Sequence, residues 1–283
     1  MAERGRLQQA LERARQRREG NAATVAPAPA APTAAPQTAA ERQSAIHSMR
    51  VFEEIPYDRD ECARHRVLVP DDDSSAHATG TAAYRVLRTR VLQRTRSNEW
   101  SAIGVTSPGQ GDGKSVTALN LAISIAREGN NNVFLIDLDM RNPKMCQYLG
   151  VAPPVEINDY LTGNAPAEDV LFSIGIDHLT LAGTRSKTDR ASELLASGRV
   201  EELFTYIRSI AKRPLIVVDL PPLLSTDDAL IMAPKVDACL LVLAEGKSRR
   251  DSATKALELL AEFKLAGIVL NRSHAVVTDY YSA

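Results

Sequence analysis

The stretch Gly104-Val105-Thr106-Ser107-Pro108-Gly109-Gln110-Gly111-Asp112-Gly113-Lys114-Ser115 decides the fold predicted for this chain of 283 residues. An apolar run at 100–105 leads into the glycines, and residues 116–127 follow with the apolar spacing of a helix. A strand, a glycine-rich turn and Gly-Lys-Ser at the start of a helix form the arrangement of a P-loop. The sequence therefore predicts a phosphate-binding loop at the end of a strand.

The chemistry of phosphate binding gives each part of this loop a role. Small residues let successive backbone N–H groups converge on phosphate oxygens, and the helix N-terminus adds positive partial charge. Lys114 is expected to reach the β- and γ-phosphates, and the Ser115 hydroxyl is expected to bind Mg²⁺. ATP and Mg²⁺ are the expected cofactors, and the expected nucleotide contacts are Ser107, Pro108, Gly109, Gln110, Gly111, Asp112, Gly113, Lys114, Ser115 and Val116.

One position departs from the usual P-loop spacing. Pro108 stands where the first glycine is expected, and Gly109 follows one place later. An ordinary glycine-rich turn between a strand and a helix is the alternative interpretation of the same residues. The strand and helix on either side favour nucleotide binding.

Two further apolar runs end in carboxylates. Residues 132–136 lead into Asp137, and Asp139 lies two positions later, so both side chains project the same way from the strand end. Residues 214–218 lead into Asp219, the arrangement of a Walker B motif, which holds Mg²⁺ directly or through water. Any one of these aspartates also suits a helix cap or a turn, but three aspartates at strand ends after one P-loop are hard to explain as caps.

The remaining pattern predicts the fold class. Further strands are expected at 238–242 and 266–270, and helices near 81–96, 190–210, 226–234 and 249–262. Apolar runs of strand length that alternate with helices indicate a parallel sheet buried on both faces. We therefore expect an α/β fold with a doubly wound, mostly parallel sheet of the P-loop NTPase class.

Composition limits the possible functions. A net charge of −1 gives no indication of nucleic acid as a partner. The three cysteines, Cys62, Cys146 and Cys239, are too widely spaced for a metal site and odd in number for a disulfide framework. No apolar run approaches the ~18 residues of a membrane span, and the N-terminus lacks the apolar stretch of a signal peptide. We expect a cytoplasmic protein without a transmembrane span.

The chain divides into five expected parts. Residues 1–20 form a basic helix with six arginines against three glutamates, either solvated or dependent on a docking partner, and we favour the partner. Residues 21–45 form a disordered Ala/Pro-rich linker. Residues 46–98 are expected to form an irregular wrap followed by an interface helix. Residues 99–276 form the P-loop domain, and residues 277–283 form a tail with two tyrosines.

These motifs together resemble those of the bacterial tyrosine autokinases of capsule and exopolysaccharide assembly, in the same P-loop branch as the MinD and ParA ATPases. The matching motifs are residues 107–115, 134–141 (the Walker A′ motif) and 217–222, with weaker matches at 84–88, 228–229 and 267–271. The resemblance covers the chain from about Tyr84 onwards. It implies an ATP-dependent protein-tyrosine autokinase that regulates polysaccharide polymerisation and export.

The resemblance also implies roles for individual residues. Lys114 serves the phosphates, Ser115 and Asp219 hold Mg²⁺, and Asp139 is a further carboxylate at the metal. Asp137 is the expected base, or the residue that orients the attacking tyrosine hydroxyl. Asn271, at the end of the last expected strand, could meet the adenine edge; an asparagine that simply favours a turn fits equally well.

Two departures from the family pattern concern assembly. The interface helix of the family reads Glu-x-x-Arg-x-x-Arg; Arg85 and Arg88 are present here as expected oligomer contacts, but Ala82 replaces the glutamate. The family tail carries several tyrosines, whereas only Tyr280 and Tyr281 are available here as phosphoacceptors.

The resemblance further implies a partner, and other functions stay open. The expected partner is a membrane chain-length regulator, a polysaccharide co-polymerase, on a separate chain, which would hold this protein at the inner face of the plasma membrane, with a homo-oligomer also possible. The first alternative is a MinD/ParA-like ATPase, which carries a second lysine where Pro108 stands; residues 101–113 contain no lysine. The second is a non-catalytic, nucleotide-gated adaptor of the same machinery.

Overall fold

A mostly parallel sheet organises the computed structural model, which describes residues 52–70 and 75–273. Eight strands of these residues form one sheet in the order β1-β4-β5-β3-β6-β2-β7-β8, and all neighbours are parallel except β4 and β5. The strands are β1 (Glu53–Glu54), β2 (Ala102–Thr106), β3 (Asn132–Asp137), β4 (Phe172–Ser173), β5 (Leu179–Ala182), β6 (Pro214–Asp219), β7 (Ala238–Ala244) and β8 (Leu265–Asn271). The predicted α/β fold with a mostly parallel sheet is confirmed.

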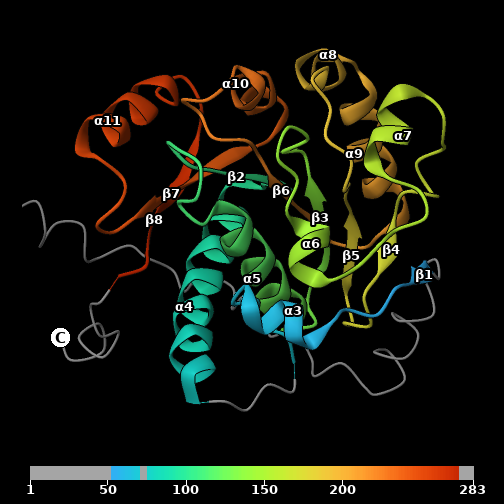
Figure 1. Cartoon of the computed structure of the whole chain (residues 1–283), viewed down its shortest axis with the longest axis horizontal. Helices are drawn as coiled ribbons and strands as arrows, with labels where there is room; N and C mark the ends of the chain where they lie inside the picture. Colours follow the sequence, from blue (N-terminus) through green and yellow to red (C-terminus); the bar gives the residue numbers. More distant parts are fainter. Residues whose placement is uncertain (1–51, 71–74, 274–283) are drawn as a thin grey trace, which may run out of the picture. The chain divides into compact units, whose positions relative to one another are not determined.

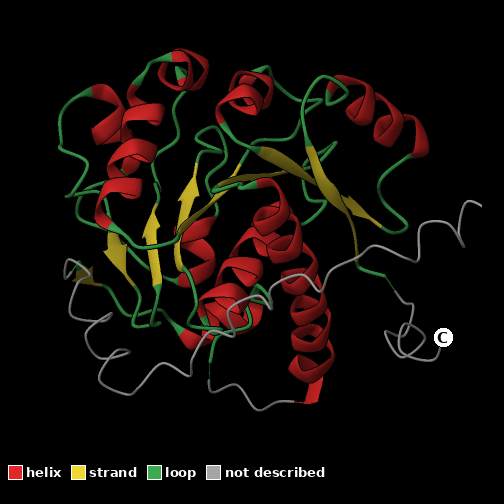
Figure 2. Ribbon diagram, turned by 180° about the vertical axis from the view of Figure 1, so that it is seen from behind, coloured by secondary structure: helices red, strands yellow, loops and turns green. Residues whose placement is uncertain are grey.

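Helices cover both faces of this sheet (Figures 1 and 2). Helices α4, α5 and α6 pack with one face of the sheet in the first core, and α7, α8, α9, α10 and α11 pack with the other face in a second core. The helices are α3 (Arg59–Arg64), α4 (Ser75–Asn98), α5 (Lys114–Ala126), α6 (Met145–Leu149), α7 (Ile157–Thr162), α8 (Ala191–Ala196), α9 (Arg199–Ile210), α10 (Asp228–Met232), the 3₁₀ turn η1 (Ala233–Lys235) and α11 (Arg250–Leu259).

The central strands β2, β3 and β6 are buried on both faces of the sheet. Every residue of β2 is buried, and β3 and β6 are buried in all positions but the first. Alternate residues of a strand face opposite sides, so Leu135 enters the first core and Phe134 enters the second. This two-sided burial is why these strands appear in the sequence as continuous apolar runs rather than as alternating patterns.

The strand register decides where the functional site lies. Asp137 of β3 is the direct neighbour of Asp219 of β6, and Val105 of β2 flanks Asp219 on its other side. The P-loop leaves the same end of β2. Ligands of open α/β sheets bind at the carboxyl ends of the strands, so the fold gathers the P-loop and both aspartates at one place.

The segment before α4 is more regular than the sequence predicted. The irregular wrap expected at 46–80 instead contains β1, which adds a strand to the edge of the sheet beside β4, and helix α3. Asp58 caps α3 because its Oδ1 accepts hydrogen bonds from the backbone N–H groups of Asp60 (2.8 Å) and Glu61 (3.1 Å). Cys62 anchors the helix as a fully buried residue of the first core.

Other boundaries also differ from those expected. Helix α5 begins at Lys114, as the Gly-Lys-Ser motif predicted, but α4 begins at Ser75 rather than near residue 81. The single helix expected at 190–210 is two, α8 and α9, separated at Ser197 and Gly198. The basic helix at 1–20, the linker at 21–45 and the tail with Tyr280 and Tyr281 lie outside the described residues.

Candidate active site

The P-loop has the backbone that its glycines permit. Gly111 and Gly113 have φ angles of +75° and +96°, a region that favours glycine. A Cβ on Gly113 would collide with the amide of Asn271, and a Cβ on Gly111 would collide with the ammonium of Lys247. Pro108 is accommodated at the start of the loop, where its carbonyl accepts a hydrogen bond from the N–H of Leu224 (3.2 Å). Gly111 and Gly113 therefore require glycine for their conformation, and Gly113 requires it for space as well.

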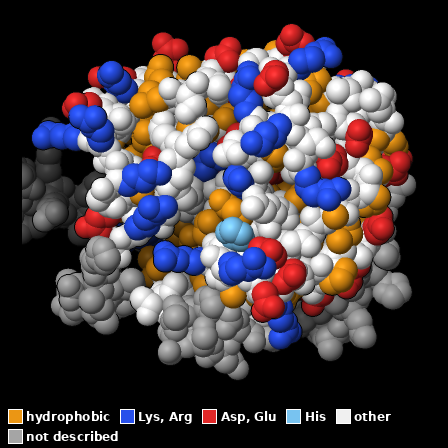
Figure 3. Space-filling view, in the orientation of Figure 1, with side chains coloured by type: hydrophobic (Ala, Val, Ile, Leu, Met, Phe, Trp, Pro, Cys, Tyr) orange, Lys and Arg blue, Asp and Glu red, His pale blue; other side chains and the backbone are white. Residues whose placement is uncertain are grey.

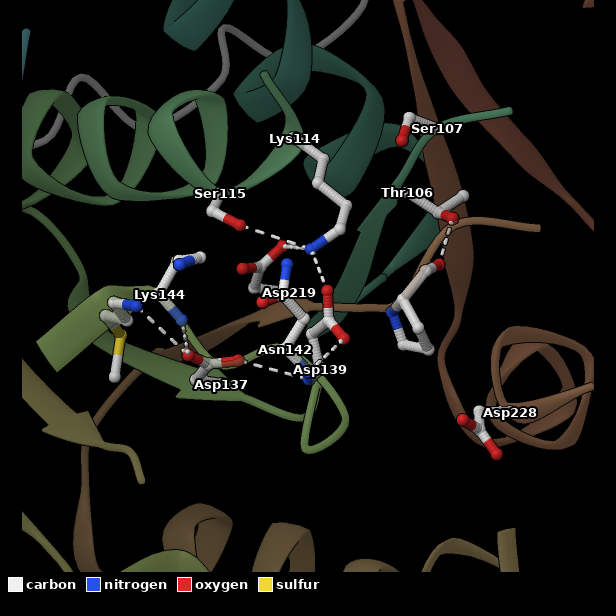
Figure 4. A network of polar contacts seen from close by, with 12 residues as sticks. Thr106, Ser107, Lys114, Ser115, Asp137, Asp139, Asn142, Lys144, Asp219 and Asp228 are labelled. Atoms are coloured by element: carbon white, nitrogen blue, oxygen red, sulfur yellow. Dashed lines mark hydrogen bonds and ion pairs between the residues drawn. The ribbon is translucent and has the colours of Figure 1, made fainter. Parts of the chain in front are cut away.

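Lys114 lies at the centre of a buried cluster of charges (Figure 4). Its ammonium lies 2.7 Å from Asp139 Oδ2 and 3.1 Å from Asp219 Oδ1, and it donates to Ser115 Oγ at 3.1 Å. Burial alone would lower the pKa of Lys114, but the nearby carboxylates outweigh burial and raise it. The lysine is therefore a fixed positive charge directly behind the P-loop.

Asp137 is buried deeper and is held by backbone groups. Its Oδ1 accepts a hydrogen bond from the N–H of Asp139 (3.0 Å), and its Oδ2 accepts from the N–H groups of Met145 (3.1 Å) and Lys144 (3.3 Å). Burial is the main reason that the pKa of Asp137 rises to about 8, and the charge of Asp219 adds to it despite Lys114. The carboxyl group is thus fixed in position and more basic than an ordinary aspartate.

Asp219 has an oxygen with no partner. Its Oδ1 contacts Lys114, but the buried Oδ2 has no hydrogen bond to any group of residues 52–70 and 75–273. Burial raises the pKa of this carboxyl, although Lys114 opposes the effect. An unsatisfied buried oxygen is costly unless a ligand completes it, and a divalent cation is the ligand that oxygen donors of this kind prefer. The residues present therefore fit Mg²⁺.

The metal ligands available from the protein are few. Within residues 52–70 and 75–273, no group of three or more His, Cys, Asp or Glu side chains is arranged to hold a metal ion by itself. Mg²⁺ usually binds proteins through one or two carboxylates and takes its other ligands from water and substrate phosphates. Ser115 Oγ, Asp219 and Asp139 around the Lys114 ammonium suit that incomplete kind of site.

Three side chains donate hydrogen bonds to carbonyl groups of the P-loop. The sequence pointed to one of them, Asn271, but not to the other two. Lys247 donates to the carbonyl of Gln110, Arg272 to that of Gly111 (2.8 Å), and Asn271 to that of Asp112 (3.0 Å). They come from the loop after β7 and from the end of β8. The amide of Asn271 thus binds the loop itself in this structure. Lys247 has no motif around it, so only the sheet order reveals its role.

Arg141, directly after the Walker A′ carboxylates, joins three elements on the other side of the site. Its Nε lies 2.6 Å from Asp228 Oδ2 on α10, and its Nη2 donates to Ser192 Oγ on α8 (2.9 Å). Burial would raise the pKa of Asp228, but hydrogen bonds from Arg141, Ser192 and Thr226 lower it. The network fixes the turn that carries Asp139.

Arg85 and Arg88 lie on α4, a separate location from the charged cluster around Lys114. Arg88 Nη1 donates to the carbonyl of Ser124 on α5 (3.1 Å), and its Nε lies 3.3 Å from Glu128 Oε2. Ala82, where the family pattern has glutamate, is exposed on the same helix. One of the two expected interface arginines is therefore already engaged within the chain.

Comparisons with known proteins place the chain among kinases. No family model matches it. Tyrosine-protein kinase YwqD of Bacillus subtilis is 30% identical over 190 residues, which cover 66% of this chain and 79% of that protein. Tyrosine-protein kinase CpsD of Streptococcus pneumoniae is 32% identical over 203 residues, which cover 70% of this chain and 86% of that protein.

Solved structures show the same fold. The kinase domain of Escherichia coli tyrosine kinase ETK aligns with a TM-score of 0.64 at 22% identity, covering 84% of this chain and 97% of that one. The cell division ATPase MinD of Pyrococcus furiosus aligns with a TM-score of 0.51 at 24% identity, covering 61% of this chain and 73% of that one. The P-loop architecture is common to both.

Proposed function

The chain belongs to the family of bacterial tyrosine-protein kinases, and we propose that it transfers phosphate from Mg²⁺·ATP to tyrosines of its own tail, Tyr280 and Tyr281. The protein is a tyrosine kinase, and autophosphorylation is the specific form of that activity proposed here. In this role it regulates the polymerisation and export of a capsular or extracellular polysaccharide together with a membrane partner.

The observation that carries this proposal is the position of the Lys114 ammonium between Asp139 and Asp219, with one Asp219 oxygen left unpaired. Phosphoryl transfer depends on positioning and on neutralising charge more than on covalent help from the protein. The glycine-rich loop binds the phosphates through backbone N–H groups, and Lys114 adds a full positive charge.

The metal and the nucleotide are proposed from the same residues. Ser115, Asp219 and Asp139 would hold Mg²⁺, which neutralises charge on the phosphates when it is bound. The residues Ser107 to Val116 would contact the nucleotide. Asn271 holds the P-loop carbonyl of Asp112, so its contribution to nucleotide binding is proposed to be through the loop, with the adenine edge as the alternative contact.

Asp137 is proposed to act on the tyrosine hydroxyl. It is fixed by backbone N–H groups and lies directly beside Asp219 at the strand ends, a position that suits a group that accepts a proton during the reaction. Arg141 and Asp228 hold the Walker A′ turn on the far side, so the position of Asp137 and Asp139 does not depend on the ligand alone.

Kinase activity is tested by separating phosphotyrosine formation from ATP hydrolysis. Purified protein is incubated with Mg²⁺·ATP, and phosphate release and phosphotyrosine are measured on the same sample. Both products are expected, and Lys114→Met is expected to lower both at least tenfold, a change of ~1.4 kcal/mol or more. Phosphate release without phosphotyrosine, in the presence of any required partner, would instead favour an ATPase adaptor of the MinD/ParA type.

A separate membrane protein is the proposed partner. Among the described residues, no helix has the length and apolar character needed to cross a bilayer. The basic helix proposed for residues 1–20, on the tether of 21–45, is the proposed docking element for a chain-length regulator at the inner face of the membrane. Co-purification of that regulator with the full chain but not with a variant lacking residues 1–45 is the expected result, and equal recovery would contradict it.

Self-association through α4 is also proposed. Arg85 and Arg88 are the residues expected at a subunit interface, although Arg88 already contacts Ser124 and Glu128. Sedimentation of the wild-type chain and of Arg85→Gln tests this; an identical mass distribution for the two would remove Arg85 from the interface.

A further inference from the structure

Two apolar side chains of the last strand, β8, are exposed in the part of the chain that the structure describes. This strand lies at the end of the sheet, and within residues 52–70 and 75–273 only β7 pairs with it. Its Ile268 and Leu270 are 50% and 55% exposed, more than the other exposed large apolar side chains, Leu224 (41%) and Leu259 (37%). Ile268 and Leu270 together are called the open strip below, and the proposed phosphoryl transfer does not use them.

The register of β8 on β7 shows which face of the sheet carries the open strip. Ile268 is the partner of Leu241, and Leu270 is the partner of Leu243. Paired residues of neighbouring strands point to the same face. Leu241 is buried in the second core, and Leu243 packs against that core together with Leu257 of α11. The open strip therefore lies on the α11 face of the sheet, and Figure 3 shows hydrophobic side chains at the surface on the side where Figure 1 places α11 and β8.

The two edges of the sheet are protected to different degrees. Strand β1 has two residues, both glutamate, whereas the seven residues of β8 contain neither a charge nor a proline. Proteins protect edge strands by shortness, charge, proline, bulges or a covering segment, because an open edge pairs with other chains. The irregular pairing of β8 lies at Ala266, before the open strip, and Arg94 of α4 contacts the strand at the carbonyl of Leu265 (3.2 Å). A covering segment is therefore the protection that suits the rest of β8.

The chain itself continues from the end of this strand. Arg272, directly after β8, has a φ angle of +59°, which ends the extended backbone, and it donates to the carbonyl of Gly111 (2.8 Å). The point from which the chain leaves β8 is thus fixed. Residues 274–283 follow, and they begin with an apolar, β-branched run at 275–278, Ala-Val-Val-Thr, which favours a strand. A tether this short gives the run an effective concentration at β8 on the order of millimolar.

We propose that residues 274–279 lie antiparallel to β8 as a further strand and cover the open strip. Main-chain hydrogen bonds along the free edge of β8 provide the pairing, and burial of apolar side chains stabilises it. A two-residue turn after Asn271 places Val277 directly beside Ile268, on the same face of the sheet. The occupant of the edge is therefore the chain's own tail rather than a second copy.

The consequence of this docking rests on the proposed function, in which the tail carries the acceptor tyrosines. The same register places Tyr280 beside Leu265 at the start of β8, roughly 20 Å from the carboxyl end of the strand, where the P-loop lies. A docked tail keeps Tyr280 and Tyr281 out of the active site of its own chain and of any other. The tail must leave β8 before its tyrosines accept phosphate.

Cross-linking of introduced cysteines tests the docking without any catalytic step. One chain carries Ile268→Cys with Val277→Cys, and the matched control carries Ile268→Cys with Ser282→Cys. The native cysteines are buried, so they do not compete. In dilute protein with a glutathione buffer, the disulfide within one chain should form at least tenfold faster for the first pair, because paired strand positions bring their Cβ atoms within reach of a disulfide.

Two results of this experiment would overturn the proposal. Equal or slower cross-linking of the first pair would show that the tail does not lie along β8. A disulfide between two chains in place of the internal one would identify a second copy as the cover of the strip. Neither result depends on kinase activity, so a failure of the docking is distinguishable from a failure of the proposed function.

The effect on the tyrosines is measured separately. Ile268→Thr with Leu270→Thr keeps two residues suited to a strand or turn to solvent but removes most of the apolar contact, so phosphotyrosine on the tail should form at least threefold faster than in wild type. An unchanged or slower rate would overturn the role of β8 in holding the tyrosines. Absence of phosphotyrosine in both proteins, with the internal disulfide formed as expected, would contradict the proposed function and leave the docking in place.

Discussion

Lys114→Met should destabilise the ligand-free protein, as well as impair catalysis. The lysine side chain is 8% exposed, and the partner side chains of Asp139 and Asp219 are 6% and 2% exposed. At an effective dielectric constant of about 20, each contact at this separation corresponds to roughly 5–6 kcal/mol of attraction, most of which offsets desolvation. Removing one partner of such a buried group typically costs about 3–5 kcal/mol.

The measurement is the free energy of unfolding from urea titrations followed by circular dichroism, without nucleotide or metal. We expect a loss of about 3–5 kcal/mol for Lys114→Met, because two carboxylates remain buried without their counter-charge. The second substitution Asp139→Asn, added to Lys114→Met, should restore part of the loss by removing one of those charges. Lys255→Met, on the exposed side of α11, is the control and should change stability by less than about 0.5 kcal/mol.

A further experiment measures stabilisation by Mg²⁺, which can bind the unpaired oxygen of Asp219. Mg²⁺ without nucleotide should stabilise the Lys114→Met chain more than the wild-type chain, because the lysine no longer occupies the space between the carboxylates. Stability of Lys114→Met within about 0.5 kcal/mol of wild type, with no response to Mg²⁺, would refute the reasoning that this lysine neutralises a buried acidic cluster.

Three other predictions follow from single contacts. Asp137→Asn should lower turnover while nucleotide affinity stays within a few-fold in a binding titration; a collapse of affinity would make Asp137 a metal-site residue instead. The pKa of Asp228 is lower in the folded protein than in the unfolded chain, so ionised Asp228 stabilises the fold above its unfolded pKa. This stabilisation is lost in acid, and the unfolding free energies of wild type and Asp228→Asn should therefore converge below about pH 4. A constant difference between the two proteins across this pH range would contradict the prediction. Lys247→Met should weaken nucleotide binding roughly fivefold, the equivalent of about 1 kcal/mol, through the lost contact with Gln110, and unchanged affinity would exclude that role.

The central strands and their aspartates were predictable because local pattern decides them. Continuous apolar runs end at Asp137 and Asp219, and a parallel sheet places such ends together, as the pairing of these two residues confirms. The short elements were not predictable. Strand β5 has four residues and helix α6 has five, too few to show a period, and the antiparallel pairing of β4 with β5 depends on packing at the sheet edge.

The outer support of the P-loop could not be found from sequence because it depends on which strands are neighbours. Lys247 and Arg272 reach the loop only because β7 lies beside β2 and β8 lies beside β7. The sequence around helix α3 contains one local indication of a helix, the capping residue Asp58, but the mixture of polar and apolar residues within the helix hides the helical spacing. The site chemistry therefore followed from motifs, whereas the positioning residues required the tertiary structure.

Phosphorylation between two chains tests the central claim most directly. A Lys114→Met chain with its native tail is mixed with an active chain carrying Tyr280→Phe and Tyr281→Phe, Mg²⁺·ATP and any required membrane partner. Intact-mass analysis should find phosphate on the Lys114→Met chain, because its tail is the acceptor and the other chain supplies the active site. No phosphate on that chain, with ATP hydrolysis intact in the mixture, would contradict autophosphorylation of the tail.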